Sequence, residues 1–307
     1  MQTETQSSLT VRAYAKINLT LDVFSKRADG YHGVASVMQT IGLSDTLHLA
    51  MSDTEGIQFS CDAPSSIPVP NDSTNLVYRA AQNLIEASKE SGKPTPKGVS
   101  LRLEKRVPSQ AGLGGGSSDA AAALRGLNAL CGWGWSDKEL IAFSAQLGSD
   151  VPFFILGGTV VARGRGEMLT PLTDAPPLSL VVVKPDIGVS TGWAYSALDS
   201  IEERASHRAT KRMEEALAQN DTGRFLSFQS NDFERVVFEQ VKQLFWLHDE
   251  LIMAGAQTAH LCGSGSAVYG VAKSEEEAQR ITRLLLQKYP LTFATRTLSR
   301  AEVQASY

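Results

Sequence analysis

The sequence predicts an α+β protein, because strand-like and helix-like segments are mixed along the chain without the strict alternation of a doubly wound sheet. Residues 9–24 alternate apolar and polar side chains with a period of two, which is typical of a strand. Residues 74–88 instead carry their apolar side chains along one helical stripe. No internal repeat and no low-complexity linker interrupts this mixture.

Further elements follow from the same two periods. Strands are predicted at 34–50, 99–103 and 178–184. Two helices are expected to begin with capping boxes, at Ser136 and at Ser274. The helix after Ser274 is expected to turn Leu284 inward with its other apolar residues. The predicted helices are 74–88, 119–130, 136–148, 201–219, 233–251 and the segment that follows 274.

Composition limits the class of protein. The 307 residues, 42% hydrophobic and 20% charged, are typical of a globular protein with one large domain or two ordinary ones. A net charge of −4 does not favour nucleic acid or an anionic membrane as a partner. No secretory signal and no apolar run of about 20 residues is found, so a cytoplasmic location is expected. Cys61, Cys131 and Cys262 form no CxxC pair, and buried free thiols without a metal site are expected.

A glycine-rich loop between residues 108 and 119 points to a bound anion. It reads Pro-Ser-Gln-Ala-Gly-Leu-Gly-Gly-Gly-Ser-Ser-Asp, and four glycines in five residues allow a ligand to approach the backbone closely. The amides can form an anion-binding nest, and the following helix directs its N-terminus at the same place. Ser117 and Ser118 offer hydroxyls for a phosphate or for Mg²⁺. A Walker A loop would need Gly-Lys-Ser/Thr, and a Rossmann loop would need a glycine at Ser117. A purely structural loop stays open as an alternative.

Three motifs in this chain resemble those of the GHMP kinases. The glycine loop resembles the phosphate-binding motif of that family, residues 15–19 (Ala-Lys-Ile-Asn-Leu) resemble the first motif, and residues 261–267 (Leu-Cys-Gly-Ser-Gly-Ser-Ala) resemble the third. The resemblance implies a two-domain fold with an N-terminal ribosomal-S5-domain-2-like domain and a C-terminal ferredoxin-like domain. It implies boundaries at 1–162, with a returning segment at about 292–307, and at 163–291.

Two further stretches resemble one branch of the family. These are Arg-Ala-Asp-Gly-Tyr-His at 27–32 and Leu-Gly-Ser-Asp-Val-Pro-Phe-Phe at 147–154. The branch phosphorylates the 2-hydroxyl of a cytidine-diphosphate-linked branched tetritol in the non-mevalonate isoprenoid pathway. The resemblance therefore implies an ATP-dependent alcohol kinase whose partner is a small molecule with a cytidine diphosphate group. It implies no oligomeric state.

The resemblance also implies the roles of individual residues. ATP is expected as co-substrate, with Mg²⁺ accompanying it. Asp150 is expected to accept the proton of the substrate hydroxyl, and Lys16 to keep Asp150 ionised and to steady the developing charge. The expected ATP-binding residues are Pro108, Ser109, Gln110, Ala111, Gly112, Leu113, Gly114, Gly115, Gly116, Ser117 and Ser118.

Each catalytic candidate also has a structural interpretation. Lys16 lies on the polar face of a strand, where it could simply face solvent. Asp150 lies two residues before Pro152 and could be a helix N-cap. Asp119, the competing carboxylate, is interpreted as a helix-start residue that suits the helix dipole.

The expected acceptor site consists of aromatic and polar side chains. The resemblance implies that the cytosine lies between Tyr31 and a second aromatic, for which Tyr195 is favoured, with His32 beside it and Asn18 on the Lys16 face. Ordinary surface residues are the alternative. For the adenine, residues 71–75 and Lys105 are candidate neighbours only.

Three other functions remain open. Another GHMP kinase, of the mevalonate or homoserine type, would accept simple alcohols instead of cytidine-linked ones. A GHMP-fold decarboxylase would release carbon dioxide. A nucleotide-binding protein without catalysis would bind ATP but release no ADP with any acceptor.

Overall fold

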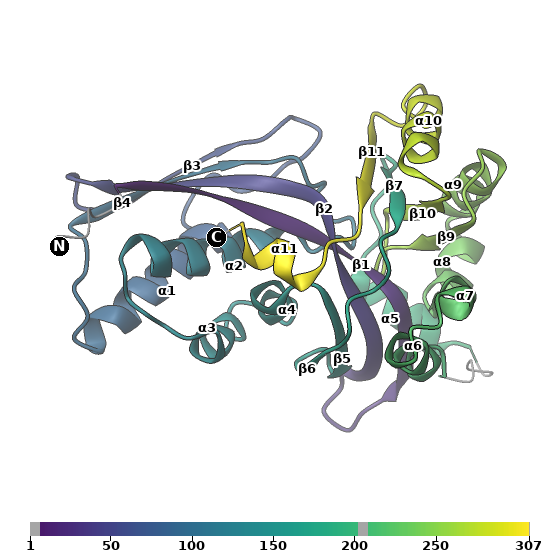
Figure 1. Cartoon of the computed structure of the whole chain (residues 1–307), viewed down its shortest axis with the longest axis horizontal. Coiled ribbons are helices and arrows are strands. Elements are labelled where there is room, and N and C mark those ends of the chain that lie inside the picture. Colours follow the sequence, from purple (N-terminus) through teal and green to yellow (C-terminus); the bar gives the residue numbers. More distant parts are fainter. Residues whose placement is uncertain (1–6, 202–207, 307) are drawn as a thin grey trace.

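Two lobes, each built on one β-sheet, make up the chain (Figure 1). The computed structural model describes residues 7–201 and 208–306. In its described part the first sheet has seven strands: β1 (Ser8–Lys26), β2 (His32–Ser52), β3 (Gly56–Asp62), β4 (Gly98–Glu104), β5 (Thr159–Gly164), β6 (Met168–Pro171) and β8 (Ser230–Asn231). The helices packed on it are α1 (Leu76–Glu90), α2 (Gly115–Leu130), α3 (Asp137–Ser144) and α4 (Val151–Leu156).

The second lobe holds a four-stranded sheet in the order β11-β7-β10-β9. Its strands are β7 (Ser179–Lys184), β9 (Thr258–Leu261), β10 (Val268–Ala272) and β11 (Leu291–Arg296). Its helices are α5 (Thr191–Asp199), α6 (Ala209–Ala218), α7 (Thr222–Phe225), a 3-10 turn (Leu226–Phe228), α8 (Glu234–Gln240), α9 (Lys242–Met253) and α10 (Glu275–Leu285). The mixed strands and helices of both lobes confirm the predicted α+β class.

The long strands β1 and β2 belong to the first sheet and extend from the first lobe to the second, so that one end of each lies beside the second lobe (Figure 1). They pair antiparallel, with register shifts between Tyr14 and Lys16 and between Asn18 and Thr20. Such irregularities bend a strand and redirect its side chains. Lys16 and Asn18 lie on the same face of β1, as predicted, since Lys16 Nζ donates to Asn18 Oδ1. Together with Thr20 and Asp22 they are buried and do not face solvent.

The last residues return to the first lobe. After β11, the Leu298 amide donates to the Thr40 carbonyl at 2.9 Å, and α11 (Arg300–Gln304) follows it. The predicted boundary at 162/163 falls inside β5, and the predicted return at 292 falls inside β11. Sheet membership does not divide the chain at single points, since β8 belongs to the first sheet although β7 and β9 belong to the second, and the predicted boundaries stay predictions.

Other helix predictions are corrected in detail. Helix α2 begins at Gly115 and not at 119, and 233–251 is two helices that meet at Val241. Of the predicted helix 201–219, α6 is observed, and residues 202–207 lie outside the described residues. Ser274 does cap α10, but Leu284 is 49% exposed because it lies on the outer side of that helix.

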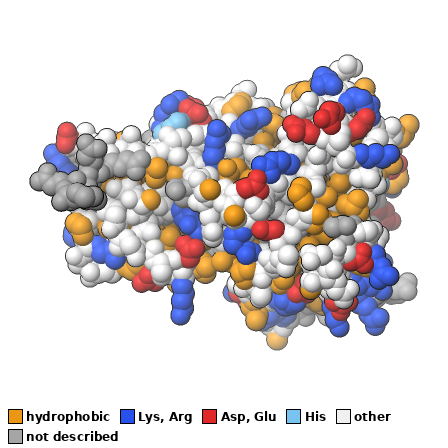
Figure 2. All heavy atoms as spheres, viewed as in Figure 1, with side chains coloured by type: hydrophobic (Ala, Val, Ile, Leu, Met, Phe, Trp, Pro, Cys, Tyr) orange, Lys and Arg blue, Asp and Glu red, His pale blue; other side chains and the backbone are white. Residues whose placement is uncertain are grey.

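Figure 2 shows Lys, Arg, Asp and Glu side chains interspersed over the face in view. Neither sign of charge collects into a large patch on the described part of this face. Among the described residues, no helix combines the length and the apolar character that a membrane crossing requires.

Candidate active site

The glycine loop forms the first turn of α2. Gly114 occupies the N-cap position in the left-handed region, with φ +70°, and the helix begins at Gly115. The first amides of a helix have no partner within it, so this turn presents a set of free N–H donors. Pro108 through Gly112 and the first turn of α2 line a cavity of about 390 Å³, and residues 68–70 and 74–76 line its other side.

Two of the glycines are required by protein contacts. A Cβ on Gly112 would lie 1.8 Å from the Cys262 carbonyl oxygen, and a Cβ on Gly114 would lie 2.6 Å from the Phe154 ring. At Gly116 the nearest atom would be 3.6 Å away, an ordinary contact. Close approach to a ligand therefore explains only part of the glycine run.

Two hydrogen bonds attach the loop to β1. The Lys16 amide leaves the ladder at the register shift and donates to the Leu113 carbonyl at 3.0 Å. The Ser118 hydroxyl donates to the Tyr14 carbonyl at 2.6 Å, and Ser118 is buried. Its hydroxyl hydrogen is therefore used inside the protein, whereas Ser117 lines the cavity. This differs from the expectation that both hydroxyls face a phosphate.

The third glycine-rich motif lies directly against the loop. The Ala267 amide donates to the Ala111 carbonyl at 3.1 Å. Asn231 holds the turn from the other side, since its Nδ2 donates to the carbonyls of Leu261, at 2.9 Å, and Gly263, at 2.7 Å. The glycine loop and the turn at residues 261–267, which resemble two separate motifs of the family, are thus in contact.

A cavity of about 900 Å³ lies beside the loop and is lined by residues of both lobes. Gly112 and Gly114 lie at one end of its lining, so it adjoins the loop cavity. The structure brings together here all six residues predicted for catalysis and for acceptor binding: Lys16, Asn18, Tyr31, His32, Asp150 and Tyr195.

Lys16 is held near Asp150 by a second polar residue. Its Nζ lies 4.0 Å from Asp150 Oδ2, at the limit of an ion pair, and donates to Asn18 Oδ1 at 2.8 Å. The Lys16 side chain is 6% exposed and that of Asp150 is 42% exposed. A partly solvated pair of charges at this distance interacts by about 1 kcal/mol. The ammonium is therefore fixed mainly by hydrogen bonding, and the carboxylate remains accessible to a ligand.

Asp150 stands at the N-cap position of α4, but its side chain makes no capping hydrogen bond. The helix has Pro152 in its first turn, where a missing N–H costs nothing. Asp150 therefore has the position of a helix cap, as the alternative interpretation expects, but its side chain makes none of the capping hydrogen bonds. Its carboxylate is turned toward the cavity that Lys16 and Asn18 also line.

Aromatic side chains form the far wall of the cavity. His32 stacks on Tyr195 with 4.8 Å between ring centroids, and Tyr195 meets Phe233 edge to face. His32 Nε2 is 2.8 Å from Asp199 Oδ1. Tyr31 is 58% exposed and lies under a guanidinium, that of Arg165, at 4.9 Å.

Sequence reasoning missed Arg165 and Asp199. Arg165 lies in a cluster of glycines and arginines at residues 157–166, beside the predicted boundary at 162/163, and it lines the cavity with Asp199. Asp199 ends α5, an element that was not predicted. Its separation of 167 residues from His32 leaves no local pattern from which to infer the pair.

A buried group of charges lies beneath the loop cavity. Lys105 Nζ donates to Asp45 and, at 2.6 Å, to Asp119 Oδ2, and all three side chains are almost fully buried. Asp45 Oδ1 also accepts from the Arg106 and Val107 amides, at 2.5 and 2.8 Å. Asp119 is therefore an ion-pair residue that ties α2 to Asp45 in β2 and to Lys105, which follows β4. Its predicted place at the start of the helix is wrong, because α2 begins four residues earlier, at Gly115.

Burial dominates the protonation of Asp119. It raises the pKa of that carboxyl well above its usual value, and Asp45 adds to the effect while Lys105 opposes it. Burial alone would lower the pKa of Lys105, but Asp119 and Asp45 outweigh it and the pKa is raised. Lys105 therefore stays charged, and Asp119 keeps its proton to a higher pH than an exposed aspartate does.

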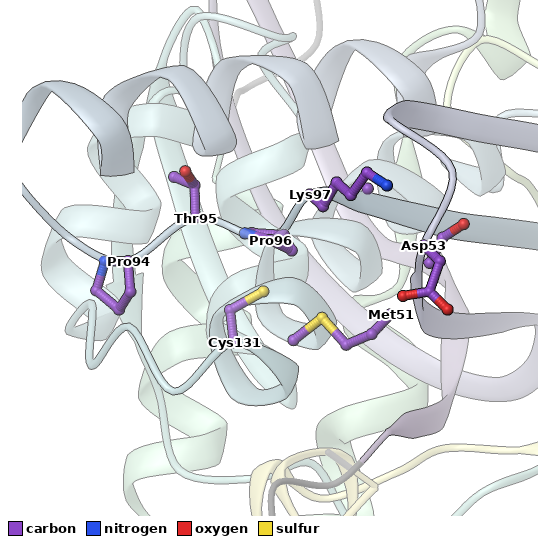
Figure 3. A pocket seen from close by; sticks show the side chains of 9 residues that line it. Met51, Asp53, Pro94, Thr95, Pro96, Lys97 and Cys131 are labelled. Atoms are coloured by element: carbon purple, nitrogen blue, oxygen red, sulfur yellow. The ribbon is translucent and has the colours of Figure 1, made fainter.

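Figure 3 shows a different hollow, of about 470 Å³, at the opposite end of α2. It contains Cys131, the C-cap of α2, along with Met51 and the segment 94–98. A helix of this length separates it from the glycine loop by about 24 Å. It contains none of the predicted site residues and is not part of the candidate site.

Comparisons with known proteins agree with the geometry. A family model described as GHMP kinases N terminal domain matches residues 75–158, and one described as GHMP kinases C terminal matches 213–291. The chain is 42% identical to the 4-diphosphocytidyl-2-C-methyl-D-erythritol kinase of Moorella thermoacetica, over 94% of this chain and 99% of the relative. It is 40% identical to the kinase of the same name from Desulfitobacterium hafniense, over 95% and 96%.

A solved structure is similar over nearly the whole chain. It is the crystal structure of 4-(cytidine 5'-diphospho)-2C-methyl-D-erythritol kinase, with a TM-score of 0.76 and 33% identity, and the match covers 94% of this chain and 99% of that one.

Proposed function

Because the chain belongs to the GHMP kinase family, we propose that it transfers the γ-phosphoryl group of ATP to the 2-hydroxyl of 4-diphosphocytidyl-2-C-methyl-D-erythritol, an isoprenoid precursor. The observation that carries the proposal is the cavity of about 900 Å³, which joins Lys16 and Asp150 to an aromatic wall and adjoins the glycine loop. The named relatives supply the identity of the acceptor.

ATP binds along the glycine loop in this proposal. The first-turn amides of α2 and the Ser117 hydroxyl contact the phosphates, because a helix N-terminus combines free N–H donors with the positive end of the dipole. The adenosine lies in the cavity between the loop and segments 68–70 and 74–76, above the buried Lys105. Its volume of about 390 Å³ suits a nucleoside.

Asp150 and Lys16 perform the proton transfer and the charge stabilisation. Asp150 accepts the proton of the substrate 2-hydroxyl as the hydroxyl oxygen attacks the γ-phosphorus, and the bond from this phosphorus to the β,γ-bridging oxygen breaks so that ADP leaves. The ammonium of Lys16, 4.0 Å from the carboxylate, attracts the negatively charged phosphoryl group. Positive charge from a preoriented side chain costs little reorganisation during the step.

The cytidine end lies at the aromatic wall. Tyr31 offers an exposed ring face, and the stacked pair of His32 and Tyr195 forms the opposing surface. His32 already covers one face of Tyr195, so the base stacks against the pair as a unit. The Arg165 guanidinium over Tyr31 is a donor within reach of the pyrimidine or its phosphates.

Mg²⁺ enters with the nucleotide in this proposal. Among the described residues, no three His, Cys, Asp or Glu side chains are grouped as metal ligands. The Ser117 hydroxyl and the Asp150 carboxylate line the two adjoining cavities and offer oxygen, the ligand that Mg²⁺ prefers. The ion would neutralise phosphate charge.

An ADP-release assay with a panel of acceptors tests the proposal. We expect release with ATP and the cytidyl-linked tetritol, and little with mevalonate or homoserine, which have no pyrimidine for the aromatic wall. Release with a simple alcohol alone would favour another GHMP kinase activity. Carbon dioxide release would favour a decarboxylase. ATP binding without ADP release in the presence of any acceptor would indicate a nucleotide-binding protein without catalysis.

A further inference from the structure

A buried serine on β2 completes a chain of hydrogen bonds that ends at the Lys16 ammonium. Lys16 Nζ donates to Asn18 Oδ1 at 2.8 Å, and Asn18 Nδ2 donates to Ser36 Oγ at 2.8 Å. The Ser36 hydroxyl then donates to the Thr20 carbonyl at 2.6 Å. Ser36 is 2% exposed and its separation from Asn18 is 18 residues. No sequence motif in this chain singles it out.

Hydrogen counting fixes the direction of the whole chain. A serine hydroxyl has one hydrogen, and that of Ser36 is committed to a carbonyl, so toward Asn18 it can only accept. Asn18 must therefore present its NH₂ to Ser36 and its carbonyl oxygen to Lys16, which has only donors. A reversed carboxamide would set oxygen against oxygen at one end and NH₂ against ammonium at the other. Only the first orientation of the Asn18 carboxamide forms hydrogen bonds with both Lys16 and Ser36.

The backbone explains why this serine reaches the carboxamide. Asn18 pairs with Met38 across the ladder, but Thr20 pairs with Val37, which marks a one-residue register shift. A shift of this kind disturbs the regular hydrogen bonding and redirects side chains. The Ser36 hydroxyl bonds the Thr20 carbonyl at this point, and the Val37 amide bonds Thr20 Oγ1 at 3.0 Å. Ser36 thus joins the irregular strand to the carboxamide through one hydroxyl.

We propose that Ser36 is a positioning residue for phosphoryl transfer, which fixes the Asn18 carboxamide and through it the Lys16 ammonium. The role in transfer rests on the proposed function. Lys16 has no side-chain partner closer than Asn18 among the described residues, because Asp150 is 4.0 Å away. Loss of the serine hydroxyl removes a hydrogen bond from the buried Asn18 NH₂ and another from the buried Thr20 carbonyl. Because an unpaired buried polar group is costly, the Asn18 side chain is then expected to change its position.

Kinetics of five variants test the proposal. Ser36→Ala should lower kcat about 10- to 100-fold, the scale of a displaced catalytic group, while the KM values for ATP and acceptor change less. Ser36→Thr keeps a hydroxyl and should recover most of kcat. Asn18→Ala combined with Ser36→Ala should be no slower than Asn18→Ala alone, because Ser36 acts through Asn18. Ser44→Ala, a buried serine of the same strand, is the matched control and should keep wild-type kcat.

A wild-type kcat in Ser36→Ala would overturn the proposal. So would a double variant that is slower than Asn18→Ala by the same factor by which Ser36→Ala is slower than the wild type. A substrate-free measurement separates this failure from failure of the proposed function. The Asn18 carboxamide signals in a ¹⁵N correlation spectrum should shift and exchange faster in Ser36→Ala but not in Ser44→Ala. Unchanged signals would contradict the positioning role. Shifted signals in a chain that phosphorylates nothing would support the hydrogen-bond chain and contradict the proposed function alone.

Discussion

Replacing Gly112 with alanine should destabilise the protein through contacts inside it, before any ligand is bound. The added Cβ would lie 1.8 Å from the Cys262 carbonyl oxygen, whereas ordinary contact begins at 3.4 Å, and φ is +75°. The left-handed backbone costs a non-glycine residue about 1–2 kcal/mol, and overpacking costs about 1–3 kcal/mol. We expect the free energy of unfolding to fall by about 2–5 kcal/mol.

Gly116→Ala is the matched control within the same loop. Its Cβ would meet only Leu76 Cδ1, at 3.6 Å, and alanine is a better helix former than glycine by about 1 kcal/mol. Urea unfolding and ATP titration should therefore separate the two changes. Gly112→Ala should lose stability, and Gly116→Ala should keep or gain stability but bind ATP more weakly. Equal stability of Gly112→Ala and the wild type would refute the packing argument.

Three further results are expected. Tyr31→Ala should raise the KM for the cytidyl-linked acceptor roughly 2- to 12-fold, the contribution of one aromatic stack, without changing the KM for ATP. A change in the KM for ATP alone would show that the cytosine binds elsewhere. Since burial raises the folded-state pKa of Asp119 above its unfolded value, its contribution to stability falls as pH rises between the two values. The unfolding free energy of Asp119→Asn relative to wild type, measured by urea titration, should therefore increase as the pH rises above the usual pKa of an aspartate, and a constant difference would contradict the shift. Burial raises the pKa of Cys262 to about 12, so a thiol reagent at pH 8 should label it only after unfolding, and rapid labelling of the native chain would show that the glycine turn opens.

Periodic patterns predicted the strands and the site residues that lie on them. The period of two in residues 9–24 put Lys16 and Asn18 on one face, and the structure has them there. The same pattern could not show that this face is buried, because the second lobe that covers it comes from distant parts of the chain. The resemblance to family motifs, and not periodicity, brought Asp150 and Tyr195 into the prediction.

The errors have physical causes. The alanine- and leucine-rich stretch 119–130 predicted a helix that begins at 119. In the structure Lys105 and the Tyr14 carbonyl anchor Asp119 and Ser118 to the first sheet, and the glycine turn before them is helical as well. Asp45 lies 60 residues from Lys105, so their ion pair has no local signature. Cys61 and Cys131 are only partly buried, and of the three free thiols Cys262 alone meets the expectation of burial.

Phosphoryl transfer to the cytidyl-linked tetritol, measured in a single turnover, tests the central claim most directly. Labelled γ-phosphate from ATP should appear on the tetritol 2-hydroxyl with the wild type. Asp150→Asn should slow this step by about 10²–10⁴-fold, the usual contribution of a general base, while it still binds ATP. Transfer at the wild-type rate by Asp150→Asn would contradict the role of the carboxylate, and no transfer by the wild type would contradict the function itself.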